Sequence, residues 1–402
     1  MRSTRAVSVR EKLTIIVTGY AATYPVGGAT WDYLQYVLGF KRLGHRVYYL
    51  EDTGRWTWDV AQNTFSDDAS ANAAYLARWI ATLDPDLAHH WALRDVHGRY
   101  YGMSRAQVAS LCRETDVLLN YSGCCILREE YMACRTKVYL DSDPLYNQAG
   151  IIDYVHGTAD DQTRWAVDCM RQHDRFVSFG ESIGQAHCLI PTDLFAWQPT
   201  RQPIVLDCWA KSSAAVRDVY TTVMSWQPDS GTVTVNGVVY GGKHAEFGKF
   251  INLPRRTSQS LELAIGGGLP PVDHLRQRGW QVIDAYAVSP DPWKYRQYIG
   301  TSKAEFSVAK QAYVATRSGW FSGRSACYLA AGKPVVVQDT GFSAHIPSGE
   351  GLLAFATEDE ALAAIERINR DYPRHAAAAS RLAREYFDAQ RVLPAFLQTV
   401  LA

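Results

Sequence analysis

The sequence predicts an α/β protein with two doubly wound, Rossmann-like domains, and three observations support this. Short apolar runs rich in β-branched residues alternate with longer amphipathic stretches, as parallel strands alternate with crossover helices. The length of 402 residues exceeds what one hydrophobic core usually serves, so two domains of about 200 residues are expected. Residues 191–203 contain three prolines and no periodicity, which indicates a linker between the domains.

The first half begins with a strand, a loop and a helix. Residues 13–18 are an apolar run that ends at Gly19, and residues 30–43 have helical periodicity. A second strand at residues 47–50 follows at the distance that a parallel pair requires. The other elements expected in this half are helices at 70–83 and 104–114 and strands at 117–120, 138–140 and 175–178.

The second half repeats the alternation. Asn236-Gly237 favours a two-residue turn, so residues 232–240 are expected to form a hairpin. The other expected elements are strands at 221–224, 261–265, 281–283, 334–337 and 352–355 and helices at 272–278, 326–331, 358–372, 374–386 and 392–401. The predicted divisions are a first domain at 1–195, a second at 196–386 and a terminal helix at 387–402.

Composition limits the function classes. The 41 basic residues balance 41 acidic ones, so no global field attracts nucleic acids or membranes. No apolar run reaches the roughly 18 residues of a membrane helix, and a cytoplasmic location is expected. The eight cysteines include no C-x-x-C pair, which favours reduced thiols over a zinc or redox site.

Residues 318–342 predict an anion site. Small and polar residues gather where an apolar helix begins, and the unpaired N–H groups and the dipole at such a point favour a phosphate. Arg324 adds a charge-assisted contact. The residues expected to bind the phosphate here are Ser318, Gly319, Ser322, Arg324 and Ser325.

A second group of binding residues follows the expected strand at 334–337. Asp339, Thr340 and Gly341 lie at its carboxyl end, where open α/β sheets bind ligands. Gly332 ends the preceding helix, so the phosphate-binding and hydroxyl-binding groups are expected to share one crevice.

The segment SGWFSGRSACYLAAGKPVVVQDTGF resembles the donor-site signature of GT-B glycosyltransferases, in which a helix ending in A-x-G-x-P-V-V carries the nucleotide diphosphate. The resemblance extends over residues 291–322 and, more loosely, over residues 27–52. It implies two domains that face a central cleft, with the acceptor on the first, the donor on the second, and a last helix that crosses back. One branch of these enzymes carries two glutamates at positions that are Gly319 and Cys327 here, so its retaining mechanism is not implied.

The function that the resemblance implies is transfer of a hexose or pentose from a nucleotide diphosphate sugar, first of all a UDP-sugar, to an acceptor hydroxyl. It implies no tightly bound cofactor and no metal. A nucleotide-sugar epimerase or phosphorylase on the same scaffold, or a non-catalytic nucleotide- or carbohydrate-binding protein, remain alternatives. The acceptor class stays open among small metabolites, lipids, polysaccharides and modified DNA, and the net charge does not indicate DNA.

Three carboxylates at strand ends are candidate bases, because inverting transfer requires a group that takes the acceptor proton. Asp143 is preferred to Asp52 and Asp141, since Pro144 stops the strand and holds Asp143 extended. A helix cap or a turn is the alternative role for each. Asp141-Ser142-Asp143 has the spacing of a metal motif, but it lies in the expected acceptor half, so no metal site is expected.

Several other residues are candidates with a structural alternative. Gly27 and Gly28 allow the backbone to approach an acceptor or the donor phosphates, or form a plain βα turn. Trp226 is expected near the diphosphate or the sugar, or in the core. The resemblance places the nucleotide base of the donor near Val288. Arg317 is a further cation beside the phosphate loop. Four more cations either turn inward or remain solvated: Lys243, Arg255, Arg256 and Lys310.

Overall fold

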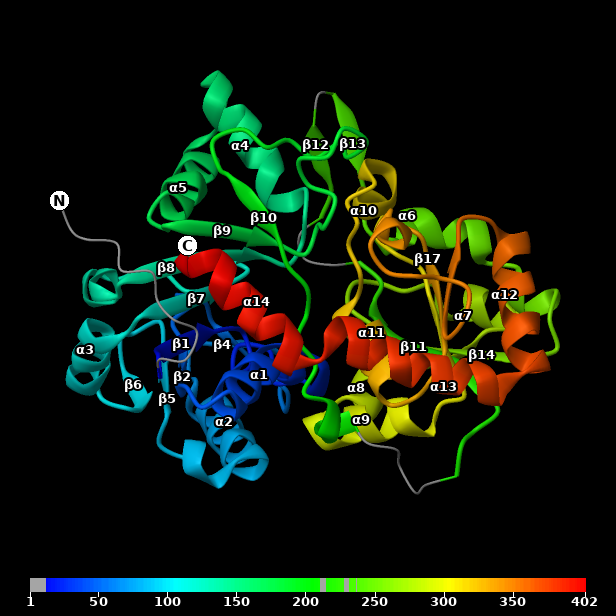
Figure 1. Cartoon of the computed structure of the whole chain (residues 1–402), viewed down its shortest axis with the longest axis horizontal. Coiled ribbons are helices and arrows are strands. Elements are labelled where there is room, and N and C mark those ends of the chain that lie inside the picture. The colour runs from blue at the N-terminus through cyan, green and yellow to red at the C-terminus, as the bar shows by residue number, and fades with distance from the viewer. Residues whose placement is uncertain (1–11, 210–214, 228–230, 236) are drawn as a thin grey trace.

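The chain folds around two separate parallel sheets, as the alternation predicts (Figure 1). The computed structural model describes residues 12–209, 215–227, 231–235 and 237–402. The α/β class and the two doubly wound units are confirmed. Strands such as β1 are buried along their whole length, because helices cover both faces of each sheet.

The first sheet has eight strands, and all neighbours are parallel except the edge pair β5 and β6. Its order is β10 (Trp197–Pro199), β9 (Arg175–Ser178), β8 (Thr136–Asp141), β7 (Val117–Tyr121), β1 (Thr14–Thr18), β2 (Arg46–Glu51), β5 (Trp91–Arg94) and β6 (Tyr100–Gly102). The helices of this half are α1 (Gly27–Arg42), α2 (Ser70–Leu83), α3 (Arg105–Glu114), α4 (Tyr146–His156) and α5 (Asp161–Met170). A small hairpin joins β3 (Thr57–Asp59) to β4 (Thr64–Ser66).

The second sheet has six parallel strands. Its order is β15 (Gln281–Asp284), β14 (Ser260–Gly266), β11 (Val219–Ser225), β16 (Ala304–Ser307), β17 (Val335–Gln338) and β18 (Leu352–Phe355). Its helices are α6 (Lys243–Phe247), α7 (Val272–Gln277), α8 (Ala285–Val288), α9 (Pro292–Thr301), α10 (Gln311–Thr316), α11 (Gly323–Ala330), α12 (Glu358–Arg370) and α13 (Tyr372–Leu382). The strands β12 (Val233–Val235) and β13 (Val238–Tyr240) pair as the expected hairpin, whose turn residue Asn236 lies outside the described residues.

The stretch between the sheets differs from a plain linker. Residues 197–199, inside the predicted linker at 191–203, add β10 to the edge of the first sheet. Pro199 fits there because an edge strand leaves one side without ladder partners. The last strand of the first sheet therefore ends at Pro199, and the second sheet begins with Val219 in β11.

The last helix, α14 (Ala389–Leu401), returns to the first half and packs against α1 (Figure 1). The ring of Phe396 lies 6.1 Å from that of Phe40 and 6.4 Å from that of Tyr36. A Cβ added to Gly39 would lie 2.5 Å from Leu393 Cδ1, so the two helices meet closely. Helix α1 also contacts α9 of the second half, and it is buried around most of its circumference for this reason.

Candidate active site

A cleft of about 780 Å³ opens between the two halves, at the carboxyl ends of strands from both sheets. The first half contributes Asp32 from α1, Ser122 after β7, and Asp143 after β8. The opposite wall of the cleft consists of polar and charged residues of the second half, among them Lys243, Asp284, Lys310, Tyr313, Ser322 and Arg324. This is where doubly wound sheets place their ligands.

Three cations of the second half line the cleft together. Lys243 begins α6, Lys310 precedes α10, and Arg324 lies in the first turn of α11. Burial lowers the pKa of Lys243 well below its ordinary value, and the charges of Arg324 and Lys310 lower it further. A bound anion would relieve this repulsion. Of the four cations left open by the sequence, Lys243 and Lys310 therefore turn inward, whereas Arg256 pairs with Glu358 and Asp359 at the surface.

Arg324 is held rigidly by the protein. Its Nε donates to Glu305 Oε1 at 2.6 Å and its Nη1 to the carbonyl oxygen of Val223 at 2.8 Å, while Nη2 donates to Ser307 Oγ. Glu305 is fully buried, so the guanidinium neutralises a charge that has no access to water. Three of the five N–H donors of the arginine are used in this way, and two remain for a ligand.

The helix start that the sequence predicted as a phosphate site lies at the cleft. Helix α11 begins at Gly323, and its N-cap residue Ser322 makes no hydrogen bond to the helix through its side chain. Ser322, Gly323 and Arg324 all line the cleft. Ser325 does not line it, and its buried hydroxyl has no hydrogen-bond partner among the described residues.

Ser318 and Gly319 lie against the first half instead of the cleft. The amide of Ser182 donates to the carbonyl oxygen of Ser318 at 3.0 Å, and Trp320 forms an antiparallel bridge with Gly180. Gly319 has a φ of +76°, and a Cβ added to it would lie 2.6 Å from Ser182 Oγ. We call this contact the interdomain bridge, formed by residues 180–182 and 318–320.

The residues after β17 build their own loop. Asp339 accepts from the amide of Gly341 at 2.8 Å and from Ser343 Oγ at 2.6 Å. Thr340 is buried, and its carbonyl oxygen accepts from the amide of Gly319 at 2.9 Å. Asp339, Thr340 and Gly341 therefore support the interdomain bridge and do not line the cleft.

The glycines of the first loop meet the second half. The amide of Gly27 donates to the carbonyl oxygen of Ser289 at 2.9 Å, and that of Gly28 to Ser289 Oγ at 3.2 Å. A Cβ added to Gly27 would lie 2.2 Å from the carbonyl oxygen of Asp291, so the backbones approach too closely for a side chain. Only Gly28 of the pair lines the cleft.

Three further predicted donor residues, Trp226, Val288 and Arg317, also lie outside the cleft lining. The ring of Trp226 packs on Phe247 at 5.4 Å between centroids. Val288 ends α8, and Arg317 is exposed at the end of α10 with a φ of +53°. On this side of the second sheet, residues Ser225, Gly266, Gly267, Asp284, Tyr286 and Ser289 form the wall instead.

Asp143 is the one predicted base that lines the cleft. Lys310 Nζ donates to its two carboxylate oxygens at 2.8 and 2.6 Å, and the hydroxyl of Tyr313 donates to Oδ1. The carboxylate of the first half is thus tied to two groups of the second. These bonds occupy three of the roughly four acceptor sites of the carboxylate, two of them on Oδ1.

Asp141 is a structural residue of the first sheet. Its buried carboxylate accepts from Asn147 Nδ2 and Gln148 Nε2 at 2.9 Å and from Ser178 Oγ at 2.7 Å. Burial raises the pKa of Asp141, and these hydrogen bonds act against the shift. The side chain joins β8 to β9 and to the first turn of α4, and it does not line the cleft.

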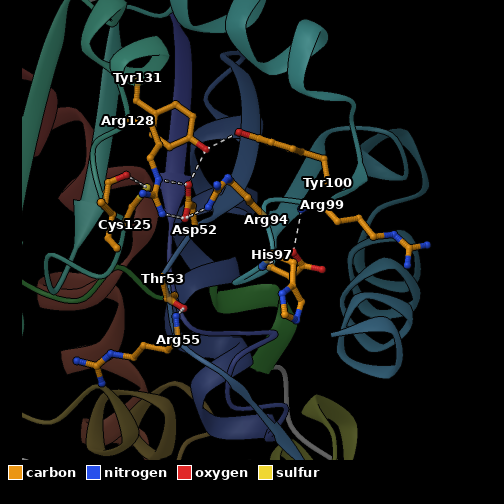
Figure 2. Close-up of polar contacts among 12 residues, drawn as sticks. Asp52, Thr53, Arg55, Arg94, His97, Arg99, Tyr100, Cys125, Arg128 and Tyr131 are labelled. Carbon is orange, nitrogen blue, oxygen red and sulfur yellow. Dashed lines mark hydrogen bonds and ion pairs between the residues drawn. The ribbon is translucent and has the colours of Figure 1, made fainter. Parts of the chain in front are cut away.

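Asp52 is buried at the carboxyl end of β2 (Figure 2). Arg128 donates to both of its oxygens at 3.0 and 2.9 Å, and the hydroxyl of Tyr131 donates to Oδ2 at 3.0 Å. Arg94 Nη1 lies 3.5 Å from Oδ1. The carboxylate therefore joins the end of β2 to Arg128 and Tyr131, and it does not line the cleft. Figure 2 shows Arg55 pointing away from this group.

One cleft carboxylate was missed from the sequence. Asp32 lies in the second turn of α1 and faces the start of α11, where a Cβ added to Gly323 would lie 3.3 Å from Asp32 Oδ1. It is open to water in the cleft, yet dense protein around it raises its pKa to about 7, against the lowering by Arg324. A signal existed in the sequence, because Asp32 is the one acidic residue within the otherwise mostly buried stretch 27–42.

Known proteins resemble this chain in fold but not in sequence. No family model and no curated protein matches this sequence. HepE of Anabaena, solved in complex with UDP and glucose, covers 97% of this chain and 99% of its own with 13% identity and a TM-score of 0.55. An alpha-glucosyltransferase in complex with UDP-glucose and DNA containing an abasic site covers 98% and 100% with 11% identity and a TM-score of 0.55. The chain has the GT-B fold.

A third GT-B structure agrees. AviGT4, a glycosyltransferase involved in avilamycin A biosynthesis, covers 96% of this chain and 97% of its own with 15% identity and a TM-score of 0.50. The two sheets, the cleft between them and the returning α14 of this chain are the arrangement that the sequence resemblance implied.

Within the described ranges, no group of three or more His, Cys, Asp or Glu side chains is placed to hold a metal ion. Over the same residues, no helix is both long and apolar enough to cross a membrane.

Proposed function

We propose that this protein is a glycosyltransferase that moves a hexose or pentose from a nucleotide diphosphate sugar to an acceptor hydroxyl in the cleft. The observation that carries the proposal is the group formed by Lys243, Lys310 and Arg324 beside the start of α11. Three cations and a helix N-terminus form a strong site for a diphosphate and stabilise the negative charge that develops on it as the sugar leaves.

The donor is proposed to be a UDP-sugar, and the leaving diphosphate to be neutralised without a metal. HepE and the alpha-glucosyltransferase were solved with UDP or UDP-glucose, and both share the fold. The three cations supply the positive charge that a divalent ion provides elsewhere. No tightly bound cofactor is needed for this reaction.

The reaction is proposed to invert the anomeric carbon, because neither position of the retaining glutamate pair can serve here. Gly319 is enclosed by Ser182 in the interdomain bridge. Cys327 is 2% exposed and accepts a hydrogen bond from Gln35 Nε2 at 3.6 Å. A glutamate at either position would clash with the first half instead of reaching a sugar.

The acceptor is proposed to bind the first half, residues 1–195 as drawn from the sequence and the adjoining strand β10, while residues from β11 to α13 bind the donor. Two hydroxyls of the first half, Ser122 Oγ and Ser142 Oγ, meet at 2.5 Å in the cleft wall and offer hydrogen bonds to an acceptor. The acceptor class stays open, with DNA among the candidates. All eight cysteines are free thiols, which favours action in a reducing compartment such as the cytoplasm.

The test uses purified full-length protein and a panel of UDP-, dTDP-, GDP- and ADP-sugars. Each nucleotide sugar is screened by thermal shift, since a bound ligand raises the melting temperature by mass action. Release of nucleoside diphosphate is then followed with and without EDTA. Release that is unaffected by EDTA supports the proposal. A nucleotide that binds but whose sugar is never released indicates a binding protein, and conversion to a different nucleotide sugar indicates an epimerase.

A further inference from the structure

The cleft holds two carboxylates of the first half, and their hydrogen-bond partners differ. Asp143 is engaged by Lys310 and Tyr313. Asp32 has no hydrogen bond or ion pair through its carboxylate among the described residues, although it lines the same cleft. The oxygens of Asp32 are therefore available to a substrate without any rearrangement of the protein.

The position of Asp32 sets it opposite the donor side. It projects from α1 of the first half toward Gly323 at the start of α11 in the second half, with 3.3 Å between Oδ1 and a Cβ added to that glycine. An acceptor bound on the first half and a diphosphate at α11 would meet beside this carboxylate. That is the place where a proton must be removed in an inverting displacement.

The surroundings of Asp32 tune it for proton transfer near neutral pH. The dense protein around it raises its pKa to about 7, although the side chain reaches water in the cleft, and Arg324 of α11 lowers the pKa. A base whose pKa lies near the working pH is the most effective, since it is both ionised and basic. The other titratable groups that face it, by their electrostatic coupling to it, are Tyr33 and Tyr36 of α1, Tyr121 of β7, Tyr295 of α9 and Cys327 of α11.

We propose that Asp32 is the catalytic base, a role that rests on the glycosyltransferase function proposed above. As the acceptor oxygen forms its bond to the anomeric carbon, the bond from that carbon to the diphosphate oxygen breaks. The electron pair of that bond leaves with the diphosphate, which Lys243, Lys310 and Arg324 hold. The proton of the acceptor hydroxyl passes to a carboxylate oxygen of Asp32 and then to solvent. Attack opposite the leaving group inverts the configuration.

The experiment compares Asp32→Asn with the wild type on the nucleotide sugar that the wild type consumes fastest in the panel. Asp32→Asn keeps the shape of the side chain, so KM for the donor should stay within about threefold while kcat falls by roughly 100-fold or more. For the wild type, log(kcat/KM) should rise with unit slope as the pH approaches about 7 and then level off. Asp32→Asn should lose this dependence, and Asp32→Glu should restore part of the turnover and a titration.

A stability measurement separates the proposed role from a structural one. The raised pKa means that the folded protein ionises Asp32 less readily than the unfolded chain does, so stability is lost as the pH rises from the ordinary aspartate pKa to about 7, and the loss is complete above that pH. Asp32→Asn should therefore melt at a higher temperature than the wild type at pH 8 and at nearly the same temperature at pH 4. Asp273→Asn, at an exposed carboxylate of α7, is the matched control and should change neither the turnover nor the melting temperature.

Three results would overturn the assignment. Near-normal turnover of Asp32→Asn would exclude Asp32 while leaving the glycosyltransferase function in place, and loss of the pH dependence in Asp143→Asn instead would move the base to Asp143. A product with retained anomeric configuration would exclude any base of this kind. A wild-type protein that consumes no nucleotide sugar would overturn the proposed function, and the role of Asp32 with it.

Discussion

Replacing Arg324 should separate its structural role from its role in binding. In Arg324→Met, the fully buried carboxylate of Glu305 loses its counter-ion, and an uncompensated buried charge costs about 3–5 kcal/mol of unfolding free energy. The double variant Arg324→Met/Glu305→Met removes both charges. It should recover most of the stability, because a buried ion pair replaced by apolar side chains of similar size is often neutral.

The binding effect should remain in the double variant. Two N–H donors of Arg324 are left for a phosphate after its bonds to Glu305, Val223 and Ser307. A hydrogen bond to a charged group contributes about 1.5–3 kcal/mol, so the dissociation constant for UDP should rise by about 10- to 150-fold. Uridine, which carries no phosphate, should bind the wild type and the double variant equally.

Chemical denaturation and titration calorimetry measure the two effects. Urea unfolding gives the stabilities of the wild type and the single and double variants, and calorimetry gives the affinities for UDP and uridine. If Arg324→Met is as stable as the wild type, then the Glu305 carboxylate does not depend on the guanidinium. If the double variant binds UDP as tightly as the wild type, or loses UDP and uridine affinity equally, then Arg324 is not a phosphate ligand.

Other predictions follow from single contacts. Lys243→Met should weaken UDP binding yet raise the melting temperature at pH 7, because burial disfavours the protonated lysine in the folded state. The gain in melting temperature should shrink as the pH approaches the ordinary lysine pKa. Gly27→Ala should lower the melting temperature by several degrees, because the new Cβ would lie 2.2 Å from a carbonyl oxygen, whereas in Gly28→Ala the nearest atom is a ring carbon at 3.3 Å and the loss should be small. Asp52→Asn should reduce the unfolding free energy by about 3 kcal/mol, measured in urea, while donor turnover stays within about threefold, and a loss of turnover without a loss of stability would contradict its structural role.

The fold could be predicted from the sequence because the residue patterns that indicate buried strands and helix starts are local. A strand buried on both faces must be mainly apolar, as residues 15–17 of β1 and 335–337 of β17 are. The start of α11 is visible for the same reason: small residues and Arg324 precede an apolar stretch that Gly332 ends. The short strands β6 and β10 at the edges of the first sheet, and β5 beside β6, were missed because each has only three or four residues.

Of the site residues predicted from the sequence, the four that line the cleft are Gly28, Asp143, Ser322 and Arg324. Ser318 and Gly319 were expected at the phosphate because they are close to α11 in sequence, but the interdomain bridge takes them to Ser182. Asp32 was overlooked because a strand end was taken as the mark of a base, whereas α1 places it in the cleft from within a helix. Which half covers a residue depends on how the halves meet, and no local pattern contains that information.

The return of α14 to α1 has a consequence for the order in which the protein can be completed during synthesis. Domains fold as units while the chain is made, with the N-terminal one first. Here the apolar surface of α1 around Tyr36 and Phe40 is covered by Phe396 and its neighbours, which are translated only after the second half. This surface of the first half therefore stays uncovered until the whole second half has left the ribosome.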